Sequence, residues 1–596
     1  MIAENYFTDD QDLMLIFDHM TDWAGVARAY EGDDFREHAL YRETEDERYA
    51  LAPADESEAL ELYRSTLQAM GEFWGKEVSQ AGAEMDRHGL KYADGQVEFP
   101  PDAIRLYEKY RETGLIPYAM PREAHGLGLP ATVWAFSSMV MARADVSFNM
   151  TINLQNLAQI VARYGTEEQI ARWAAPAAQG DTLFAMSLTE PDFGSDLGNV
   201  RTTATKQADG TYRLNGTKRF ISQGCGLGPY PAVHLTLART GGPGARGLSV
   251  FLVKSQDVQI AGIERKMGIH ASPTCEVVLE DVPGELLGRE GQGLTRCTLG
   301  MTSFMRLGSF AGAAGGSAAG LSESLKYARE RLQFGKAIEE IPAVAEMLDR
   351  MRREMNAQRL FSIETAFAVD KHQPEQIRLE KQGVSDRDIR RNEKIRDWAT
   401  LSSLLTSLAK YYCSEKTLEI ASMAVQIHGG AGYTEDYDVS RLYRDARINT
   451  IYEGTSQLHV GISVAAITAG MSADGFLRRY LADIKDEIGS ISDFAAEQAT
   501  ALDEAVTTHR SLPDENIRGR FAEELVRMAA RYLCTLLYER AVKRLTESDA
   551  ADEATLERWQ LDSASFGMDS AAIASSSLYR IRNAEKVYGQ PAPAMV

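Results

Sequence analysis

The chain has few cysteines and no pairing among them. Its 596 residues include five, Cys225, Cys275, Cys297, Cys413 and Cys534. Because the number is odd and the positions are scattered, the sequence argues against a disulfide framework and lacks the paired spacing of a zinc site. We expect free, mostly buried thiols in a reducing compartment.

Long apolar runs and a basic targeting segment are also absent. No apolar run approaches the ~20 residues that cross a bilayer, and the first residues, MIAENYFTDDQDLMLIF, carry acids where a secretory signal is basic. We therefore expect no membrane span and a cytoplasmic location. The net charge of -22 repels phosphate backbones, which argues against nucleic-acid binding.

The pattern of apolar residues and turn signals along the sequence predicts a mainly helical protein with one β-rich insert. TEEQ (166–169) has the pattern of a capping box at a helix start. Short β-branched and aromatic runs then occur between 182 and 294, namely TLFAMSL, TYRLNGTKRFIS with its NG turn, AVHLTLAR, GLSVFLVK and TCEVVLEDV. From 300 the pattern is helical again, and it opens with FAGAAGGSAAG, whose small residues favour close helix packing.

These changes divide the chain into five expected regions. They are an N-terminal extension (1–56), an N-terminal helical domain (57–181), a middle β-domain (182–294), a helical domain (295–470) and an appended C-terminal helical domain (471–596). In the last region, an apolar stripe at helical spacing predicts a buried helix face, made by Phe521, Leu525, Met528, Tyr532 and Leu536. The densely charged stretch 376–397 is expected to be an exposed helical face or loop.

Two polar segments of the β-rich region have the composition of a ligand site. SLTEPDFGSD (187–196) offers hydroxyls and backbone N–H groups in a turn-rich loop. GTKRFISQG (216–224) places the ring of Phe220 two residues before the hydroxyl of Ser222, on the same side of a strand. Stacking with hydrogen bonding suits a flat heteroaromatic ring, whereas an ordinary strand with a core phenylalanine is the alternative interpretation.

Three segments of the later helical region add to this pattern. YARERLQFGKAI (327–338) carries Arg331, whose fork suits a pyrophosphate, although a solvated helix end is the alternative. QIHGGAGY (426–433) lets backbone N–H groups approach a ligand, or is a tight turn. RINTIYEGTSQLHVG (447–461) sets Glu453 at the start of an expected helix, where an acid is also favourable for the helix dipole.

Taken in this order, the five segments resemble those of the acyl-CoA dehydrogenase family of flavoproteins. With RYGTEEQIARW and KMGIHASPTCEVVLEDVPG, the resemblance covers roughly residues 80–465. It implies an N-terminal helical domain, a middle β-domain and a C-terminal four-helix bundle, with FAD between the last two. It also implies FAD-dependent α,β-dehydrogenation of an acyl-CoA to the trans-2-enoyl-CoA, with electron-transferring flavoprotein as electron acceptor.

The resemblance implies a set of FAD contacts in this chain. Phe220 takes the place usually held by a stacking tryptophan, and Ser222 that of a threonine. Arg331 and Phe334 match the pair that reaches the FAD of a neighbouring subunit, which implies a homo-oligomer. The matching positions are Leu188, Thr189, Ser195, Phe220, Ser222, Arg331, Phe334, Gln426, Gly430, Thr455 and Gln457.

The resemblance also assigns the substrate contacts and the base. Ser195, Arg306 and Gly454 match substrate-binding positions, and Glu453 occupies the place of the catalytic base that removes the α-proton. Such a base needs desolvation, for which Tyr452 and its apolar neighbours are candidates. Some family members carry the base on the earlier helix, but the corresponding residue here, Met305, cannot serve. Glu435 is a distant second candidate.

The appended region and the insertion at 376–397 make the chain look like the long subgroup of the family, which includes dehydrogenases of 3-methylmercaptopropionyl-CoA. That substrate, or a short- or medium-chain acyl-CoA, is expected, in DMSP degradation or fatty-acid β-oxidation, and a long-chain acyl-CoA is the alternative. We expect a homodimer, because the appended domain would cover the surface through which short members form tetramers.

Three rival functions share this fold. An acyl-CoA oxidase is one, although PAPAMV at the C-terminus carries no peroxisomal signal. The others are a nitroalkane-type oxidase, which uses an aspartate base where this chain has Glu453, and a DNA-binding relative, which the acidity of the chain disfavours.

Overall fold

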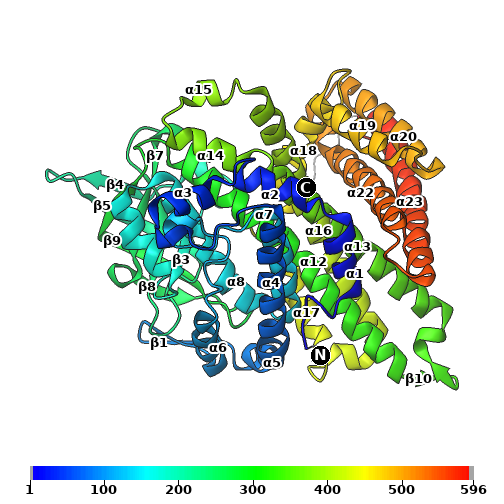
Figure 1. Cartoon of the computed structure of the whole chain (residues 1–596), viewed down its shortest axis with the longest axis horizontal. Coiled ribbons are helices and arrows are strands. Elements are labelled where there is room, and N and C mark those ends of the chain that lie inside the picture. The colour runs from blue at the N-terminus through cyan, green and yellow to red at the C-terminus, as the bar shows by residue number, and fades with distance from the viewer. Residues whose placement is uncertain (1–3, 590–596) are drawn as a thin grey trace. The chain divides into compact units, whose positions relative to one another are not determined.

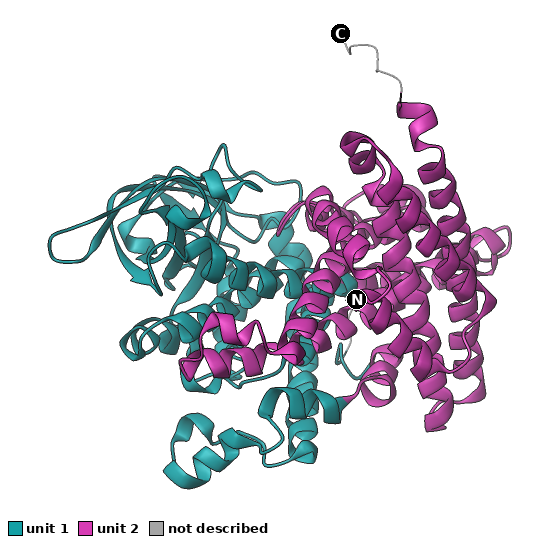
Figure 2. Ribbon diagram, turned by 90° about the horizontal axis from the view of Figure 1, so that it is seen from above, with its two compact units in different colours: residues 1–9, 23–315 teal, residues 10–22, 316–596 magenta. Residues whose placement is uncertain are grey.

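The computed structural model describes residues 4–589, whose helices and strands are labelled in Figure 1. They form two compact units, coloured separately in Figure 2. One unit comprises residues 4–9 together with Trp23–Gly315, and the other comprises Asp10–Asp22 and residues 316–589. This division is coarser than the five regions expected from the sequence, which stay a prediction. The terminal PAPAMV lies outside the described residues.

Helices make up the N-terminal part of the first unit. The longest of them, α4 (Glu56–Phe73), begins at Asp55, whose carboxylate accepts hydrogen bonds from the N–H groups of Ser57 and Glu58. The predicted capping box is confirmed, because Thr166 and Gln169 exchange side-chain and main-chain hydrogen bonds at α10 (Glu167–Gln169). The other helices here are α2 (Trp23–Glu31), α3 (Arg36–Thr44), α5 (Ser79–His88), α6 (Pro101–Glu112), α7 (Ala131–Ala144), α8 (Val146–Leu154), α9 (Ala158–Tyr164) and α11 (Ala175–Ala178).

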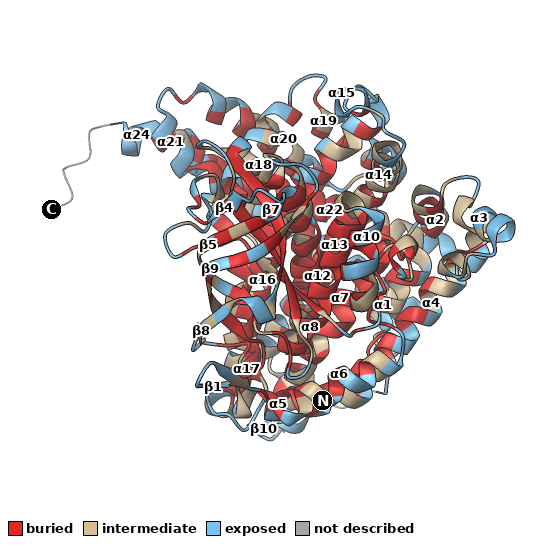
Figure 3. Cartoon of the chain, turned by 90° about the vertical axis from the view of Figure 1, so that its left-hand side faces the viewer, coloured by how far each residue is buried: buried red, intermediate tan, exposed pale blue. Residues whose placement is uncertain are grey.

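A seven-stranded sheet confirms the β-rich insert of the first unit. Its order is β3-β6-β4-β5-β9-β7, with β8 on β9, and β7 also pairs with β6, so the hydrogen bonding closes on itself. The apolar side chains of Leu214, Phe251 and Leu279 are buried within it. Figure 3 colours the chain by burial and shows buried stretches along the labelled strands β5, β7 and β9. The strands are β3 (Leu183–Ser187), β4 (Thr203–Lys206), β5 (Tyr212–Ser222), β6 (Ala232–Arg239), β7 (Leu248–Lys254), β8 (Gln259–Ile263) and β9 (Thr274–Leu287); a separate hairpin pairs β1 (Lys91–Ala93) with β2 (Gln96–Glu98).

The turn predicted at Asn215 and Gly216 is wrong. Strand β5 runs straight through both residues, and its register against β9 shifts between Leu214 and Gly216. A Cβ atom at Gly216 would lie 2.4 Å from the Oγ1 of Thr202. The glycine therefore permits the close approach of a neighbouring chain segment at an irregularity of the sheet, and it does not reverse the chain.

Long helices form the core of the second unit. The end of α12 (Leu299–Glu330), α13 (Pro342–Asp370) and α16 (Glu393–His428) share a buried cluster that includes Leu321, Met351 and Ile420. The predicted close packing at the small-residue run is confirmed at Gly315, in the part of α12 that belongs to the first unit, since a Cβ there would lie 2.3 Å from the carbonyl oxygen of Met139 on α7. The charged stretch 376–397 forms α14 (Gln373–Lys381), α15 (Asp386–Ile389) and the start of α16, and it is half-buried to exposed over most of its length, as expected.

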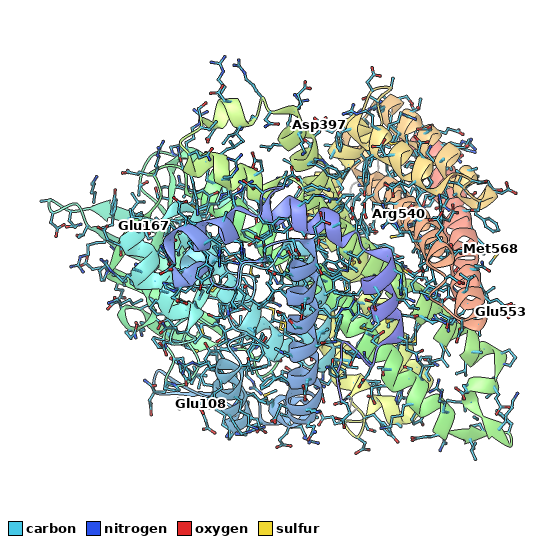
Figure 4. The ribbon with its side chains drawn as sticks, in the orientation of Figure 1. Glu108, Glu167, Asp397, Arg540, Glu553 and Met568 are labelled. Carbon is cyan, nitrogen blue, oxygen red and sulfur yellow. The ribbon has the colours of Figure 1, made fainter. Side chains whose placement is uncertain are left out.

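The C-terminal helices of the second unit pack on one another and on α13. The predicted apolar stripe is buried along α22 (Ala522–Ser548). Two arginines of α22 pair with glutamates of α13: the buried Arg531 donates to Glu354 at 2.9 Å, and the half-buried Arg540, labelled in Figure 4, pairs with Glu364. The other helices of this unit are α1 (Gln11–Leu15), α17 (Val439–Ala446), α18 (Ser456–Gly470), α19 (Phe476–Ile488), α20 (Asp493–Ser511), α21 (Glu515–Arg520), α23 (Glu553–Arg582) and α24 (Ala584–Tyr588).

Two further expectations concern the cysteines and membrane-spanning helices. All five cysteines are free thiols, and all except the half-buried Cys225 are buried, as predicted. Among residues 4–589, no helix combines the length and the apolarity that a membrane crossing needs.

Candidate active site

A buried ammonium fastens the loop after β3 to strand β5. The Nζ of Lys218 donates to the carbonyl oxygen of Leu188 at 3.1 Å and to the Oε1 of Glu190 at 2.9 Å. Next to it, the N–H of Arg219 donates to the carbonyl oxygen of Thr189 at 2.9 Å. Burial lowers the pKa of Lys218 to about 8, against the opposing effect of Glu190. Leu188 and Thr189, two of the predicted FAD contacts, are thus held beside β5.

The ring of Phe220 faces outward from the end of β5. It is 55% exposed, which excludes the alternative interpretation of a core phenylalanine. Phe220 has a φ of 61°, and the register against β9 shifts between Lys218 and Ile221. The simple strand alternation that predicted Phe220 and Ser222 on one side therefore does not apply here. The guanidinium of Arg219 lies 5.0 Å from the ring centre.

Hydroxyl groups accompany this exposed ring. Thr189 and Ser222 are half-buried and Ser195 is exposed. Within residues 4–589, none of these three hydroxyls makes a hydrogen bond to the protein. An exposed aromatic face next to uncommitted donors and acceptors has the chemistry that a flat heteroaromatic ring requires.

A buried histidine joins the same strand ends and was missed from the sequence. The Oγ of Ser187 lies 2.7 Å from the Nδ1 of His234, and the Nε2 of His234 donates to the carbonyl oxygen of Gly224 at 2.9 Å. Burial lowers the pKa of His234 to about 4, so the imidazole is neutral near pH 7. It ties the end of β3 to the loop after β5.

Arg306 and Met305 lie on the first turns of α12, in the first unit. Met305 is buried and Arg306 is half-buried. A thioether carries no basic group that could take a proton at this position, which agrees with the exclusion of Met305 as a base.

In the second unit, Glu453 does not lie in the first turn of a helix. The helix α18 starts at Ser456, and Thr455 is its N-cap, with its hydroxyl accepting the N–H of Leu458. Glu453 precedes that cap in the left-handed region, with a φ of 56°, and Gly454 follows with a φ of 100°. The interpretation of Glu453 as an acid placed for the helix dipole is therefore wrong.

Buried side chains surround the Glu453 turn. The Nζ of Lys410 donates to the Oγ of Ser414 at 3.1 Å and to the carbonyl oxygen of Asn449, and it lies 5.2 Å from the ring centre of Tyr452. The hydroxyl of Tyr452 donates to the Oδ1 of Asn449 at 3.1 Å. Glu453 is half-buried, and its Oε2 atom is buried. This carboxylate thus sits in a partly desolvated turn.

The remaining predicted FAD contacts of the second unit are exposed. Phe334 is 92% exposed at the tip of a hairpin between β10 (Leu332–Gln333) and β11 (Lys336–Ala337), and Arg331 is exposed next to it. Gln426 lies at the end of α16, and Gly430 lies in the turn that follows. Both are exposed, as is Gln457 on α18.

Comparison with known proteins assigns the family. Models of the N-terminal, middle and C-terminal domains of acyl-CoA dehydrogenases match residues 61–181, 185–282 and 291–468. The chain belongs to the acyl-CoA dehydrogenase family. It is accordingly an oxidoreductase of the acyl-CoA dehydrogenase class.

Individual relatives agree with this assignment. The chain is 32% identical to 3-methylmercaptopropionyl-CoA dehydrogenase of Ruegeria pomeroyi, over 75% of this chain and 74% of the relative. It is 37% identical to a subunit of the caffeyl-CoA reductase–Etf complex of Acetobacterium woodii, over 63% of this chain and 92% of the relative. The crystal structure of a Bacillus anthracis acyl-CoA dehydrogenase complexed with FAD shares the fold, with a TM-score of 0.70 and 22% identity, over 90% of this chain and 92% of the other.

Proposed function

We propose that this protein oxidises an acyl-CoA thioester to the trans-2-enoyl-CoA, with Glu453 as the base that takes the α-proton. The observation that carries the proposal is the placement of Glu453. This carboxylate is half-buried, with Oε2 inside the protein, and a left-handed turn sets it outside the regular helix that follows. Glu435, the second candidate, is exposed and lacks the desolvation that such a base needs.

The cofactor of this reaction is FAD, and the first unit offers side chains that fit it. The exposed ring of Phe220 provides a stacking face, and the hydroxyls of Thr189 and Ser222 can bond to the edge of the flavin. FAD, when bound, supplies an acceptor for the hydride that leaves the β-carbon. Arg331 and Phe334, at the exposed hairpin, are proposed to reach the FAD of a neighbouring subunit, and Gln426 and Gly430 to contact its ADP half.

Desolvation prepares Glu453 for proton abstraction. Removing a weakly acidic proton next to a thioester requires a partly desolvated base, and the Oε2 of Glu453 is buried. The main-chain N–H of Glu453 is proposed to donate to the thioester oxygen, where charge develops as the proton leaves. Ser195, Arg306 and Gly454 are proposed to contact the CoA ester.

The acyl group is proposed to be 3-methylmercaptopropionyl or a short to medium chain. The Ruegeria pomeroyi relative, named for that substrate, supports this choice. Electron-transferring flavoprotein is proposed as the electron acceptor, since the Acetobacterium woodii relative is named as part of a complex with Etf. We also propose a homodimer, and sedimentation of the purified protein as a tetramer would contradict it.

Anaerobic titration of the FAD-loaded protein tests the reaction. The flavin absorbance is followed with 3-methylmercaptopropionyl-CoA and with butyryl- to palmitoyl-CoA, for the wild type and Glu453→Gln. We expect rapid bleaching by one chain class in the wild type, and a rate about 10²- to 10⁴-fold lower in Glu453→Gln. Bleaching of Glu453→Gln at the wild-type rate would refute the assignment of the base, and the absence of bound flavin would refute the reaction.

A further inference from the structure

The main chain at Glu453 adopts a conformation that needs support. Its φ of 56° lies in the left-handed region, which non-glycine residues enter rarely and which persists only where surrounding contacts enforce it. The direction of the Glu453 side chain depends on this turn, because Cα and Cβ move together with the main chain. The contacts that enforce the turn therefore help to aim the carboxylate.

His459 supplies one of those contacts. Its Nε2 lies 3.1 Å from the carbonyl oxygen of Glu453, and its side chain is fully buried. A carbonyl oxygen only accepts hydrogen bonds, so Nε2 carries the proton and donates it. The imidazole comes from the first turns of α18 and reaches back across the N-cap, Thr455, to the left-handed turn.

The absence of a side chain at Gly454 leaves room for this imidazole. A Cβ atom at Gly454 would lie 2.8 Å from the Nε2 of His459 and 3.0 Å from the Cδ2 of Leu458. The space that a side chain would fill is thus taken by the imidazole and its neighbour. The φ of Gly454, 100°, also favours glycine.

The residue before Glu453 is held independently. Tyr452 donates through its hydroxyl to Asn449 at 3.1 Å, and Lys410 lies against its ring while bonding to the carbonyl oxygen of Asn449. Tyr452 is fixed on one side of Glu453, and α18 starts on the other side. The hydrogen bond from His459 to the carbonyl oxygen of Glu453 is then the contact that sets the main-chain conformation between them.

We propose that His459 is a positioning residue for the base: its Nε2–H bond to the Glu453 carbonyl fixes the left-handed turn that aims the carboxylate and the N–H of Glu453. The inference rests on the proposed function of Glu453. It extends that function to a residue that touches neither substrate nor cofactor in the proposal.

Three substitutions at one position separate the hydrogen bond from packing. In His459→Gln, the amide nitrogen can take the place of Nε2 and donate to the same carbonyl. In His459→Asn, the amide is one methylene shorter and falls near Nδ1, and in His459→Leu no donor remains. The limiting rate of flavin bleaching per bound FAD is measured by anaerobic stopped flow, together with FAD content and acyl-CoA affinity.

We expect the limiting rate to fall about 10- to 100-fold in His459→Leu and His459→Asn, because a misplacement on the order of 1 Å costs about that much. Acyl-CoA affinity should stay within about 3-fold of the wild type, and His459→Gln should recover the rate to within about 3-fold. Because rates are expressed per bound FAD, partial unfolding of a variant does not by itself lower the measured rate.

Two results would overturn the inference. One is a wild-type rate in His459→Leu, and the other is an equal loss in all three variants, which would assign the effect to the shape of the imidazole. Glu453→Gln is measured in parallel. If it bleaches like the wild type, the proposed function fails; if it is inactive while His459→Leu is fully active, only the role of His459 fails.

Discussion

Replacing Lys218 by methionine tests whether its buried ion pair fastens the loop after β3. Methionine matches the four-atom stem of lysine but lacks the ammonium that bonds to Leu188 and Glu190. Both partners of the pair are buried, with side-chain exposures of 0% and 6%. The substitution therefore leaves the carboxylate of Glu190 inside the protein without its cation.

The expected loss can be worked from the contacts that remain. Removing one partner of a buried ion pair costs about 3–5 kcal/mol. Glu190 keeps two main-chain donors, the N–H groups of Arg201 at 2.7 Å and Thr202 at 2.9 Å. In addition, burial disfavours the ammonium itself, as the pKa of about 8 for Lys218 shows. Both effects reduce the loss, so we expect about 3 kcal/mol, the lower end of that range.

Native-state hydrogen exchange of peptides from β3 and β5 measures this loss where it occurs. Lys91→Met is the matched control, because Lys91 bonds to Glu98 at 2.7 Å with exposures of 61% and 60%, and such a pair contributes less than about 1 kcal/mol. Lys218→Met combined with Glu190→Gln should recover much of the stability, since the unpaired charge is gone. Equal effects of Lys218→Met and Lys91→Met would refute the reasoning.

Two further predictions concern stability. Burial acts to raise the pKa of Glu354, but Arg531 and other neighbours outweigh it and lower the pKa to about 2; the unfolded chain therefore takes up this proton first, and unfolding free energy is lost between about pH 4.5 and 2, by about 3 kcal/mol. Urea unfolding at a series of pH values checks this, and the same acid dependence in Glu354→Gln would contradict it. Gly315→Ala should lower the melting temperature, because its Cβ would lie 2.3 Å from the carbonyl oxygen of Met139, whereas Gly316→Ala meets only a methyl group 3.6 Å away and should be neutral; equal melting temperatures would show that the helix shifts without cost.

Much of the fold could be predicted because burial imposes a periodic pattern. The apolar runs that predicted β3, β6 and β7 lie in strands that are buried almost throughout, and the run that predicted β9 lies in a strand of which half the residues are buried. Strands β4 and β8 were missed. Thr203–Lys206 is mostly exposed and carries no apolar run, and the short apolar segment of Gln259–Ile263 contains a glycine and is only half-buried. The NG signal failed for a related reason: it reports local turn preference, and pairing with β9 on the neighbouring side overrides that preference.

In the candidate site, the residues proposed to touch the ligand could be predicted from the sequence, and the residues that position them could not. Residues proposed to touch the ligand could be selected because their side chains are chemically distinctive, as a carboxylate, a guanidinium or an aromatic ring is. The residues that hold them were missed: Lys218, His234, Lys410 and His459 each bond to a main-chain carbonyl oxygen, those of Leu188, Gly224, Asn449 and Glu453.

Every residue carries such a carbonyl, so the sequence around the acceptor contains no sign of the donor. The left-handed φ of Glu453 was hidden for the same reason, because glutamate has no preference for that region and only the turn imposes it. In this protein the groups proposed for the chemistry can thus be recognised in the sequence by their residue types. The geometry that orients them is set by hydrogen bonds to main-chain atoms, which all residues share. That geometry becomes visible only when the chain is folded.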